Sequence, residues 1–428
     1  MTGHVTPAVL CTPSRAALMT GRYAVRSGMT GTDQSPPVLI YAAGSAGLPS
    51  NETSLGSLAL QHGYRTAAVG KWHLGLNAHW WGDQEHGPLG HGFQYFFGLP
   101  HTLVDGFESD DSFFTLRECF KDTELPIILF CLIPLRFVVG RKTFFSIIFL
   151  IMLMSWFTLE HFTLTRDKWW QHSEFMEKFC NSFLLENNQV VQKPVDLKTL
   201  STNLVDKSVE LISQVKTDSR PLLLYHSFAH VHTPLATADQ LRGVSDHGVY
   251  GDAVMEVDHG VGRILEAIKT AGVEEDTLVY LTSDHGGDHP QLGELGGYNG
   301  VFRGGKSNGA LEGGMRVPGI IKWPGVVEPG SSISSVTSLL DIFPTIKDIV
   351  SEDEDEVMKN KLDGESLFNV LRGEKSSSRR TIFHFCGSDI FAMRTQLEDG
   401  NIYKLILKEP VLSSSGGCDG KNNNVRSK

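Results

Sequence analysis

The stretch RTAAV, residues 65 to 69, decides the fold class of this 428-residue chain. It is short and apolar, contains β-branched residues and runs directly into Gly70, which is typical of a buried strand. Three further stretches are also short and apolar and carry β-branched or aromatic residues: Pro221 to Tyr225, Thr277 to Leu281 and Val317 to Ile321. Together the four stretches predict buried parallel strands.

Helical patterns lie between these strands. Apolar residues recur every three or four positions from Leu204 to Val215 and from Ala253 to Thr270, as on one face of an amphipathic helix. The alternation predicts an α/β fold with a large, mostly parallel sheet flanked by helices. Ligands of such folds bind beyond the carboxyl ends of the strands, so the polar residues after each strand are the first candidates for a functional site.

Composition limits the class of protein. Hydrophobic residues make up 41% and charged residues 20% of the chain, which is ordinary for a globular protein. The net charge of -11 argues against a nucleic-acid partner, because a surface that follows phosphates needs an excess of Lys and Arg. The first residues carry neither a charged segment nor a sustained apolar core, so they do not resemble a signal peptide.

Two long apolar runs interrupt the alternating pattern. Leu125 to Val139 and Thr143 to Leu164 are separated by only three residues, and the second run approaches the roughly 20 apolar residues of a membrane-spanning helix. We predict a helical hairpin within residues 119–180 that enters a lipid bilayer; the alternative is a hairpin in a hydrophobic core. Cys119 and Cys180 bracket the hairpin, and because hairpin ends lie close together, a disulfide between them is expected in an oxidising lumen.

The C-terminal part has a different pattern. Arg380 to Phe385, Ile390 to Thr395 and Asn401 to Leu407 predict three short strands in meander order. We therefore expect a large α/β domain of residues 1–340, interrupted by the hairpin, and a small antiparallel subdomain of residues 341–412. The polar tail of residues 413–428 is expected to be disordered.

The stretch CTPSRAALMTGR, residues 11 to 22, predicts a short helix with a reactive residue at its start. Thr12 suits a helix cap, Pro13 the first turn and Gly21 the end of the helix. Cys11 then lies at a helix N-terminus, where backbone N–H groups favour an anion, and Arg15 lies one turn further. A cysteine in that position is acidic and reactive; the alternative is a structural cysteine beside an ordinary cap.

This stretch resembles the signature of the type I sulfatases, Cys-x-Pro-x-Arg followed by Leu-Met-Thr-Gly-Arg. Four more segments resemble the same family in the same order: residues 70–73 (GKWH), 230–234 (HVHTP), 282–286 (TSDHG) and 304–319. The stretch from His247 to Val254 and the apolar insertion are similar to one branch, that of steryl-sulfatase and arylsulfatases D, E, F and H. The resemblance implies an alkaline-phosphatase-like fold and hydrolysis of aryl or steroid sulfate esters.

The resemblance also implies a modified nucleophile and a metal. A formylglycine-generating enzyme would oxidise Cys11 to formylglycine, whose hydrated form attacks the sulfate ester. Arg15 and Lys71 would hold the hydrated aldehyde. Calcium, which prefers oxygen ligands, would be bound by the modified Cys11 and by Asp284, with His285 a candidate by position alone.

Three further side chains would complete the reaction. Lys71 and Lys306 would hold the sulfate oxygens, His73 would assist sulfate elimination, and His232 or Lys306 would assist the leaving group. The two lysines could instead be surface residues. An alternative metal site, for zinc, is a trio of nearby histidines: His226, His230 and His232.

The sequence departs from the family pattern near its start. Members of the family have an early strand that ends in two adjacent Asp residues, which bind the calcium. Ten residues precede Cys11 and none is Asp or Glu, so we expect the sequence to be incomplete at its N-terminus, and also in its cysteine-rich C-terminal region. His285 stands where many sulfatases have Asn or Gln, and Leu311 where a Trp is usual.

The remaining expectations concern location and alternatives. Asn51 begins the sequon Asn-Glu-Thr, which suits a glycosylated loop in the lumen of the endoplasmic reticulum or Golgi. A phosphatase or phosphodiesterase of the same superfamily is a competing hypothesis, although such enzymes have Ser or Thr in place of Cys11. A catalytically impaired relative that acts as a binding protein is the other.

Overall fold

A computed structural model describes residues 1–30, 45–103, 183–288, 296–351, 360–374 and 381–408. The chain forms two compact units, one of Met1–Leu103 with Phe183–Lys428 and one of Val104–Ser182. The predicted hairpin, Cys119, Cys180 and the tail of residues 413–428 all lie outside the described residues. Among the helices that are described, none is both long enough and apolar enough to cross a membrane.

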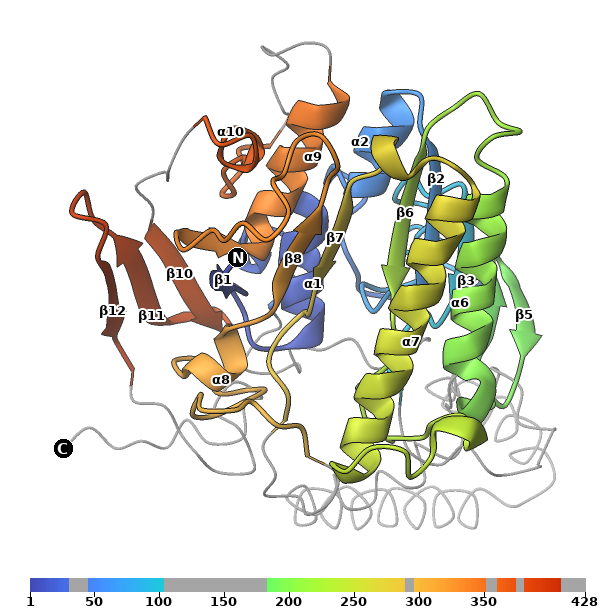
Figure 1. Ribbon diagram of the computed structural model, residues 1–428, viewed down its shortest axis with the longest axis horizontal. Helices are drawn as coiled ribbons and strands as arrows, with labels where there is room; N and C mark the ends of the chain where they lie inside the picture. Colours follow the sequence, from blue (N-terminus) through green and yellow to red (C-terminus); the bar gives the residue numbers. More distant parts are fainter. Residues whose placement is uncertain (31–44, 104–182, 289–295, 352–359, 375–380, 409–428) are drawn as a thin grey trace, which may run out of the picture. The chain divides into compact units, whose positions relative to one another are not determined.

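The largest sheet of the described residues has five strands and lies beside two long helices, on the right of Figure 1. Its order is β5 (Gln189–Gln192), β4 (Leu184–Glu186), β3 (Tyr95–Gly98), β2 (Arg65–Gly70) and β6 (Leu222–Ser227). Strand β2 pairs in parallel with β3 and β6, which confirms the predicted α/β class. The carboxyl ends of β2 and β6 therefore lie at the same sheet edge.

Strands β7 (Val279–Thr282) and β8 (Gly319–Lys322) correct one expectation. We predicted four parallel strands, but these two pair antiparallel, with Thr282 opposite Gly319. The reason is the connection between them: it leaves the carboxyl end of β7 and enters β8 at that same end of the strand pair, so β8 runs in the opposite direction. That connection carries several candidate site residues.

Burial also differs from the expectation of four buried strands. Strand β2 is buried from Thr66 to Gly70, whereas β7 is only half-buried along its whole length, and β6 is half-buried except at Ser227. Strand β2 has a neighbour on each side, but β6 pairs only with β2, and β7 only with β8, within the described part of the chain. Apolar side chains at such edges stay partly accessible.

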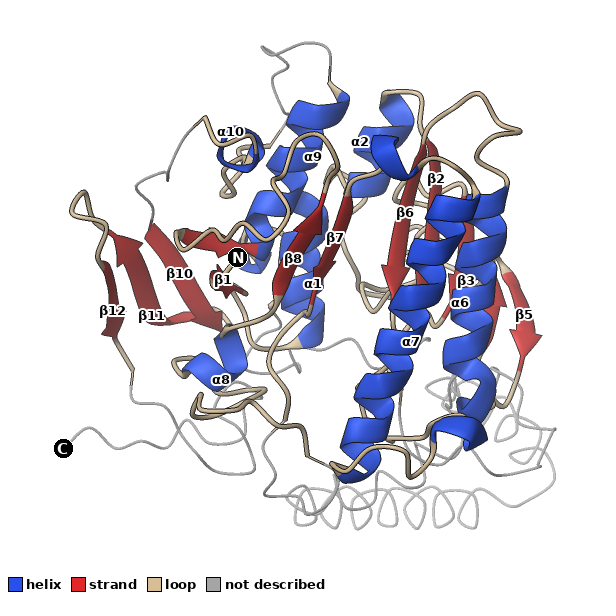
Figure 2. Ribbon diagram, viewed as in Figure 1, coloured by secondary structure: helices blue, strands red, loops and turns tan. Residues whose placement is uncertain are grey.

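Helices α6 (Leu197–Ser213) and α7 (Gly248–Thr270) lie side by side in Figure 2, and α6 packs against β2, β3 and β6. Helix α6 begins seven residues before the predicted start because Asp196 caps it, accepting the backbone N–H of Lys198 at 3.0 Å. The predicted apolar face of α7 is only partly buried, and Val254 is 42% exposed.

The remaining elements include the helix that carries Cys11. Strand β1 (Gly3–Val5) pairs in parallel with β9 (Val336–Ser338) and leads into α1 (Cys11–Thr20), whose ten residues are all buried. The other helices are η1 (Ala24–Arg26), α2 (Leu55–Gln61), η4 (Asp239–Leu241), η5 (Glu274–Asp276), α8 (Glu312–Met315), η7 (Leu339–Asp341), α9 (Ile342–Val350) and α10 (Phe368–Leu371). Among these elements, α1 contacts η1, η7 and α9.

The predicted C-terminal sheet is present. Strands β10 (Thr381–Cys386), β11 (Asp389–Gln396) and β12 (Ile402–Ile406) form an antiparallel meander in that order. Tyr23, just after α1, packs against Phe383 and Phe385 of β10. The sheet is therefore attached to the segment that follows the candidate nucleophile, while the subdomain boundaries stay a prediction.

Candidate active site

Cys11 is the first residue of α1. The preceding residue, Leu10, is extended and supplies no side-chain cap, and Cys11 therefore lies at the positive end of the helix dipole. Thr12 was the predicted cap, but the helix has already begun there. Its hydroxyl instead donates to the carbonyl oxygen of His73 at 3.0 Å. Gly21 ends the helix as predicted, with a φ of 66°.

Arg15 connects three parts of the site. Its guanidinium donates to Asp284 Oδ2 at 3.0 Å and, through Nη1, to the Lys71 carbonyl at 2.8 Å. The same Nη1 donates to Ser227 Oγ at 2.7 Å and to the Tyr225 hydroxyl at 3.2 Å. Arg15 thus fixes α1 against the ends of β2, β6 and β7.

Two of these partners were not predicted. Tyr225 and Ser227 are two residues apart on β6, so their side chains point to the same face of the strand. That alternation at the carboxyl end of a predicted strand was the available signal. It gives no information about the partner, which comes from a helix some 200 residues away in the sequence.

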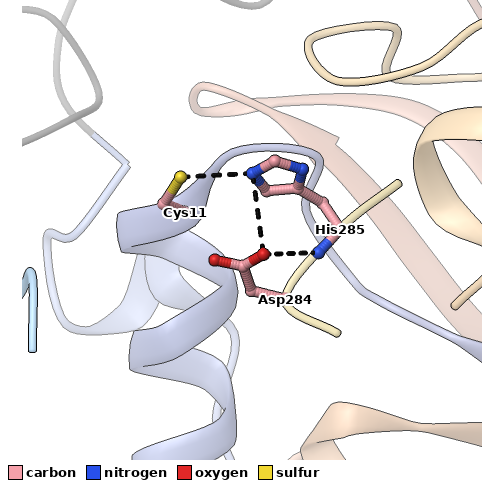
Figure 3. Close-up of side chains that lie close together, drawn as sticks. All are labelled: Cys11, Asp284 and His285. Carbon is pink, nitrogen blue, oxygen red and sulfur yellow. Dashed lines mark hydrogen bonds and ion pairs between the residues drawn. The ribbon is translucent and has the colours of Figure 1, made fainter. Parts of the chain in front are cut away.

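Asp284 and His285 follow β7 and face Cys11 (Figure 3). His285 Nε2 lies 3.2 Å from Cys11 Sγ and 3.8 Å from Asp284 Oδ1, while Nδ1 donates to the Gly286 carbonyl at 2.7 Å. Because Nδ1 carries a proton, a neutral ring would accept from the Cys11 thiol at Nε2, and a cationic ring would donate from Nε2 to the Cys11 thiolate. Asp284 Oδ1 also accepts the backbone N–H of His285 at 3.0 Å.

The charges of this group support one another. Burial opposes ionisation of the Cys11 thiol, but the positive charges of Lys71, His285 and Lys306 place its pKa well below the ordinary value. Burial also opposes a charged His285, yet Asp284 and Cys11 raise its pKa. Although burial would raise the pKa of Asp284, His285 and Arg15 lower it to about 2. The group favours an anion at position 11.

Lys71 and His73 follow β2. Gly70 has a φ of 104°, and a Cβ atom there would lie 1.7 Å from the Ser227 carbonyl oxygen, so only glycine lets the strands approach this closely. Lys71 is 3% exposed, and burial lowers its pKa. His73 is fully buried with a φ of 61°, and burial, then the Lys71 charge, lowers its pKa to about 4.

The His73 ring lies buried beside Cys11. Both ring nitrogens are shielded from water. A hydrogen-bond interaction with the Cys11 side chain, and then the charge of Cys11, offset part of the decrease in the His73 pKa. A neutral imidazole held beside the nucleophile in this way is available to accept a proton.

His232 and Lys306 form a second pair at the site. His232 Nδ1 donates to the Thr233 carbonyl at 2.6 Å, so Nε2 can accept from Lys306 Nζ, 3.4 Å away. Burial, followed by the charges of Lys306 and Lys71, holds the pKa of His232 well below its ordinary value. His232 is therefore neutral and oriented by a cation.

The two neighbouring histidines do not join them. His226 Nδ1 lies 2.7 Å from Ser208 Oγ, and His230 Nε2 donates to the Ala236 carbonyl at 2.6 Å. In the part of the chain that the structure describes, the side chains grouped as a possible metal site are those of Cys11, Asp284 and His285. The zinc alternative for the histidine trio is thus unsupported.

The loop that carries Lys306 is fastened by Asn299, which the sequence analysis missed. The Asn299 amide donates to the Gly287 carbonyl at 2.9 Å and to the Gly304 carbonyl at 3.0 Å, and it accepts the Gly287 N–H at 2.9 Å. The backbone N–H of Lys306 also donates to the Gly287 carbonyl at 3.0 Å. The signal was an Asn within a glycine-rich stretch, where such side chains often bond the backbone.

The structure therefore brings the eight predicted catalytic and metal residues into one cluster, on α1 and at the ends of β2, β6 and β7: Cys11, Arg15, Lys71, His73, His232, Asp284, His285 and Lys306. Asn51 lies elsewhere, exposed before α2. Its glycosylation stays a prediction, as does the disulfide between Cys119 and Cys180.

The donor atoms at Cys11, Asp284 and His285 lie within 4.8 Å of one another. Calcium takes six to eight oxygen ligands, and this group offers one carboxylate, one sulfur and one imidazole. The described residues therefore fit one edge of a calcium site and do not form a complete one. Arg15 and Lys71 add positive charge beside this group, and that charge would repel a cation. Further anionic ligands would therefore be needed to bind calcium here.

Comparisons with known proteins agree with this geometry. The model of the Sulfatase family matches residues 1–351. Human arylsulfatase D is 36% identical over 98% of this chain and 71% of its own length, and human steryl-sulfatase is 36% identical over 98% and 72%. Human arylsulfatase H is 35% identical over 98% and 75%.

Solved structures share the fold at lower identity. The PsFucS1 sulfatase from Pseudoalteromonas sp. superposes with a TM-score of 0.67 at 24% identity, covering 96% of this chain and 74% of that one. Ps i-CgsB in complex with k-i-k-neocarrahexaose gives 0.64 at 22% identity, covering 96% and 80%. This chain belongs to the sulfatase family and is a sulfuric ester hydrolase.

Proposed function

We propose that this chain hydrolyses aryl or steroid sulfate esters through a formylglycine made from Cys11. One observation carries the proposal: Cys11 is the first residue of α1, its Sγ lies 3.2 Å from His285 Nε2, and the charges of Lys71, His285 and Lys306 favour an anion there. A sulfate ester bears a negative charge that increases at the oxygen of the departing alcohol during cleavage. The same cations would stabilise that charge.

The residues divide the reaction between them. One hydroxyl of the hydrated aldehyde at position 11 attacks sulfur and displaces the alcohol. Lys306, which donates to His232 Nε2 at 3.4 Å, would supply a proton to the departing oxygen. His73 is neutral above a pKa of about 4, so it would take the proton of the second hydroxyl as sulfate leaves and the aldehyde re-forms.

The proposed cofactor is calcium. Asp284 and an oxygen of the converted residue 11 would be ligands of the kind that Ca²⁺ prefers. When bound, the ion would acidify the attacking hydroxyl. Since the described residues contribute a single carboxylate to this place, further oxygen ligands must come from elsewhere.

The test of the nucleophile is mass spectrometry of the Cys11 peptide after expression in a eukaryotic secretory pathway. We expect an aldehyde in place of the thiol, and the thiol when the modifying enzyme is absent. Cys11→Ser should abolish turnover because an unoxidised serine cannot form a geminal diol. An unmodified cysteine in cells that contain the modifying enzyme would refute the proposal.

The substrate class is tested by comparing kcat/KM for an aryl sulfate, a steroid sulfate, a sugar sulfate and an aryl phosphate. The names of the similar human proteins, arylsulfatases and a steryl-sulfatase, support the first two. Preference for the phosphate would favour a phosphatase of the same superfamily. Binding without turnover by the fully converted chain would favour the binding-protein alternative.

We also propose a lumenal location with membrane attachment through the hairpin. The exposed Asn51 and the disulfide-bonded Cys386, whose partner lies outside the described residues, support an oxidising secretory compartment. Deleting Leu125 to Leu164 and joining the flanking residues with a short Gly/Ser linker should release the protein from carbonate-washed membranes. An intact chain that is soluble without detergent would contradict the attachment.

A further inference from the structure

Two cations of the C-terminal sheet lie directly opposite each other. Arg394 of β11 pairs in register with Lys404 of β12. Like charges in this arrangement destabilise an antiparallel strand pair. Arg394 is only 3% exposed, so water screens little of the repulsion. The pair needs an anion between its members.

Glu312, the first residue of α8, supplies that anion. Its Oε1 accepts from Lys404 Nζ at 2.8 Å and from the Arg394 guanidinium, while Oε2 accepts from Arg316 Nε at 3.0 Å. Burial would raise the pKa of Glu312, but Arg394, Lys404 and Arg316 lower it to about 2. One carboxylate therefore joins α8 to two strands of the C-terminal sheet.

The backbone of α8 contacts both loops that carry site residues. The Gly314 carbonyl accepts the N–H of Gly286, next to His285, at 2.9 Å. The Gly313 N–H donates to the Arg303 carbonyl, three residues before Lys306, at 2.8 Å.

These contacts are made between main chains packed without intervening side chains. A Cβ atom on Gly286 would lie 1.6 Å from the Gly313 carbonyl oxygen, and one on Gly314 would lie 2.3 Å from the Gly305 carbonyl oxygen. No flexible side chain separates α8 from these loops. A displacement of α8 would therefore move His285 and Lys306 with it.

We propose that Glu312 is a positioning residue for catalysis, holding α8 on the C-terminal sheet and thereby fixing His285 against Cys11 and Lys306 against His232. The proposal deepens the proposed function and rests on it. Glu312 does not touch the reacting atoms, so its effect passes through the two loops. The C-terminal sheet is then part of the framework of the active site.

The test compares Glu312→Gln, which keeps the shape and removes the charge, with Glu312→Asp, which keeps the charge. Glu374→Gln is the control, because Glu374 forms an exposed ion pair with Arg372 at 3.0 Å. We expect Glu312→Gln to lower kcat at least about 10-fold and to weaken inhibition by inorganic sulfate by a similar factor. Glu312→Asp should recover part of both, and Glu374→Gln should match the parent enzyme.

A second readout does not depend on turnover. In protein produced without the modifying enzyme, Cys11 remains a thiol next to His285 and its rate of alkylation can be followed on its peptide by mass spectrometry. We expect Glu312→Gln to change this rate at least about threefold, because displaced cations would alter the thiolate fraction. If the rate changes while no form hydrolyses sulfate esters, the positioning stands and the proposed function fails.

Glu312→Gln could fold poorly, so Lys404→Met provides a milder change. It leaves Glu312 paired with Arg394 and Arg316 and removes one of the two opposed cations. We expect changes in the same direction as Glu312→Gln but smaller. The proposal is overturned if the folded fractions of both variants keep the parent kcat, sulfate inhibition and Cys11 alkylation rate, whatever happens to their melting temperatures.

Discussion

The two sides of the active site are built differently. On one side Lys71 and His73 follow β2, which is buried and has neighbours β3 and β6. On the other, Asp284 and His285 follow β7, which is half-buried and pairs only with β8 within the described residues. Similar apolar sequences thus end in two unlike environments.

The electrostatic consequences are opposite. Burial and Lys71 lower the pKa of His73 to about 4, whereas Asp284 and Cys11 overcome burial and raise the pKa of His285. The β2 side therefore holds a neutral imidazole beside a cation, and the β7 side favours a charged one beside a carboxylate. The proposed sulfate-binding side thus follows a strand with neighbours on both sides, while the proposed metal side offers fewer anionic ligands than a calcium ion needs.

The largest expected effect comes from the β2 side. Lys71→Met should lower kcat/KM about 10³-fold, because it removes a buried cation aimed at the developing negative charge. Lys269→Met, at an exposed position of α7, is the control and should have no effect. Steady-state kinetics with an aryl sulfate measures both, and a loss below tenfold would show that Lys306 alone suffices.

The next effect comes from the β7 side. Asp284→Asn should lower kcat/KM about 10²-fold, abolish calcium dependence and destabilise the fold by about 3 kcal/mol, because it leaves the largely buried Arg15 without its anion. Calcium titration by calorimetry and urea unfolding are the measurements. Asp218→Asn breaks an exposed ion pair and should be nearly neutral. Activity of the parent chain that a chelator leaves unchanged would contradict the calcium proposal.

The pH dependence of stability should separate the two histidines. An unfolded His73 binds a proton near pH 6.5 but the folded one only near pH 4, so the unfolded state binds more protons between these values. Stability should fall over that window as pH decreases, by at most about 3 kcal/mol from this group. His73→Asn should flatten the acid limb in urea unfolding, since Asn tolerates the positive φ.

His285 should act with the opposite sign. Its folded pKa is raised, so its contribution is fully present below about pH 6.5 and is lost as pH rises through the raised value. A variant His285→Asn should therefore flatten the alkaline limb and leave the window of His73, between about pH 4 and pH 6.5, unchanged. If both substitutions flatten the same limb, the contrast between the two sides is wrong.

The smallest effect concerns the contact between α1 and the β2 side. Thr12→Val removes the buried hydrogen bond from the Thr12 hydroxyl to the His73 carbonyl and should cost about 1 kcal/mol in the free energy of unfolding. Thr12→Ser keeps the hydroxyl and should cost less. A loss for Thr12→Ser with none for Thr12→Val would instead assign the effect to the methyl group, which valine keeps.

The sequence predicted the fold class from local patterns and the members of the site from the resemblance to the sulfatase motifs. Apolar runs gave β2, β6, β7 and β8, and the segments that resemble those motifs gave Lys71, His73, Asp284 and His285. It could not give the direction of β8, which depends on where the connection re-enters the sheet. Nor could it pair Arg15 with Tyr225 and Ser227, since those contacts join distant segments and leave no periodic signal.

Three closely packed glycines near the active-site residues affect how a mutational scan of this chain should be interpreted. Gly70, Gly286 and Gly313 are each packed so that a Cβ atom would lie 2.0 Å or less from a carbonyl oxygen. Every substitution there should be as damaging as the loss of Cys11, although none of the three supplies a reactive group. In a saturation scan scored by activity alone, the positions that tolerate no substitution would therefore include places where main chains are in contact, as well as the residues that take part in the reaction.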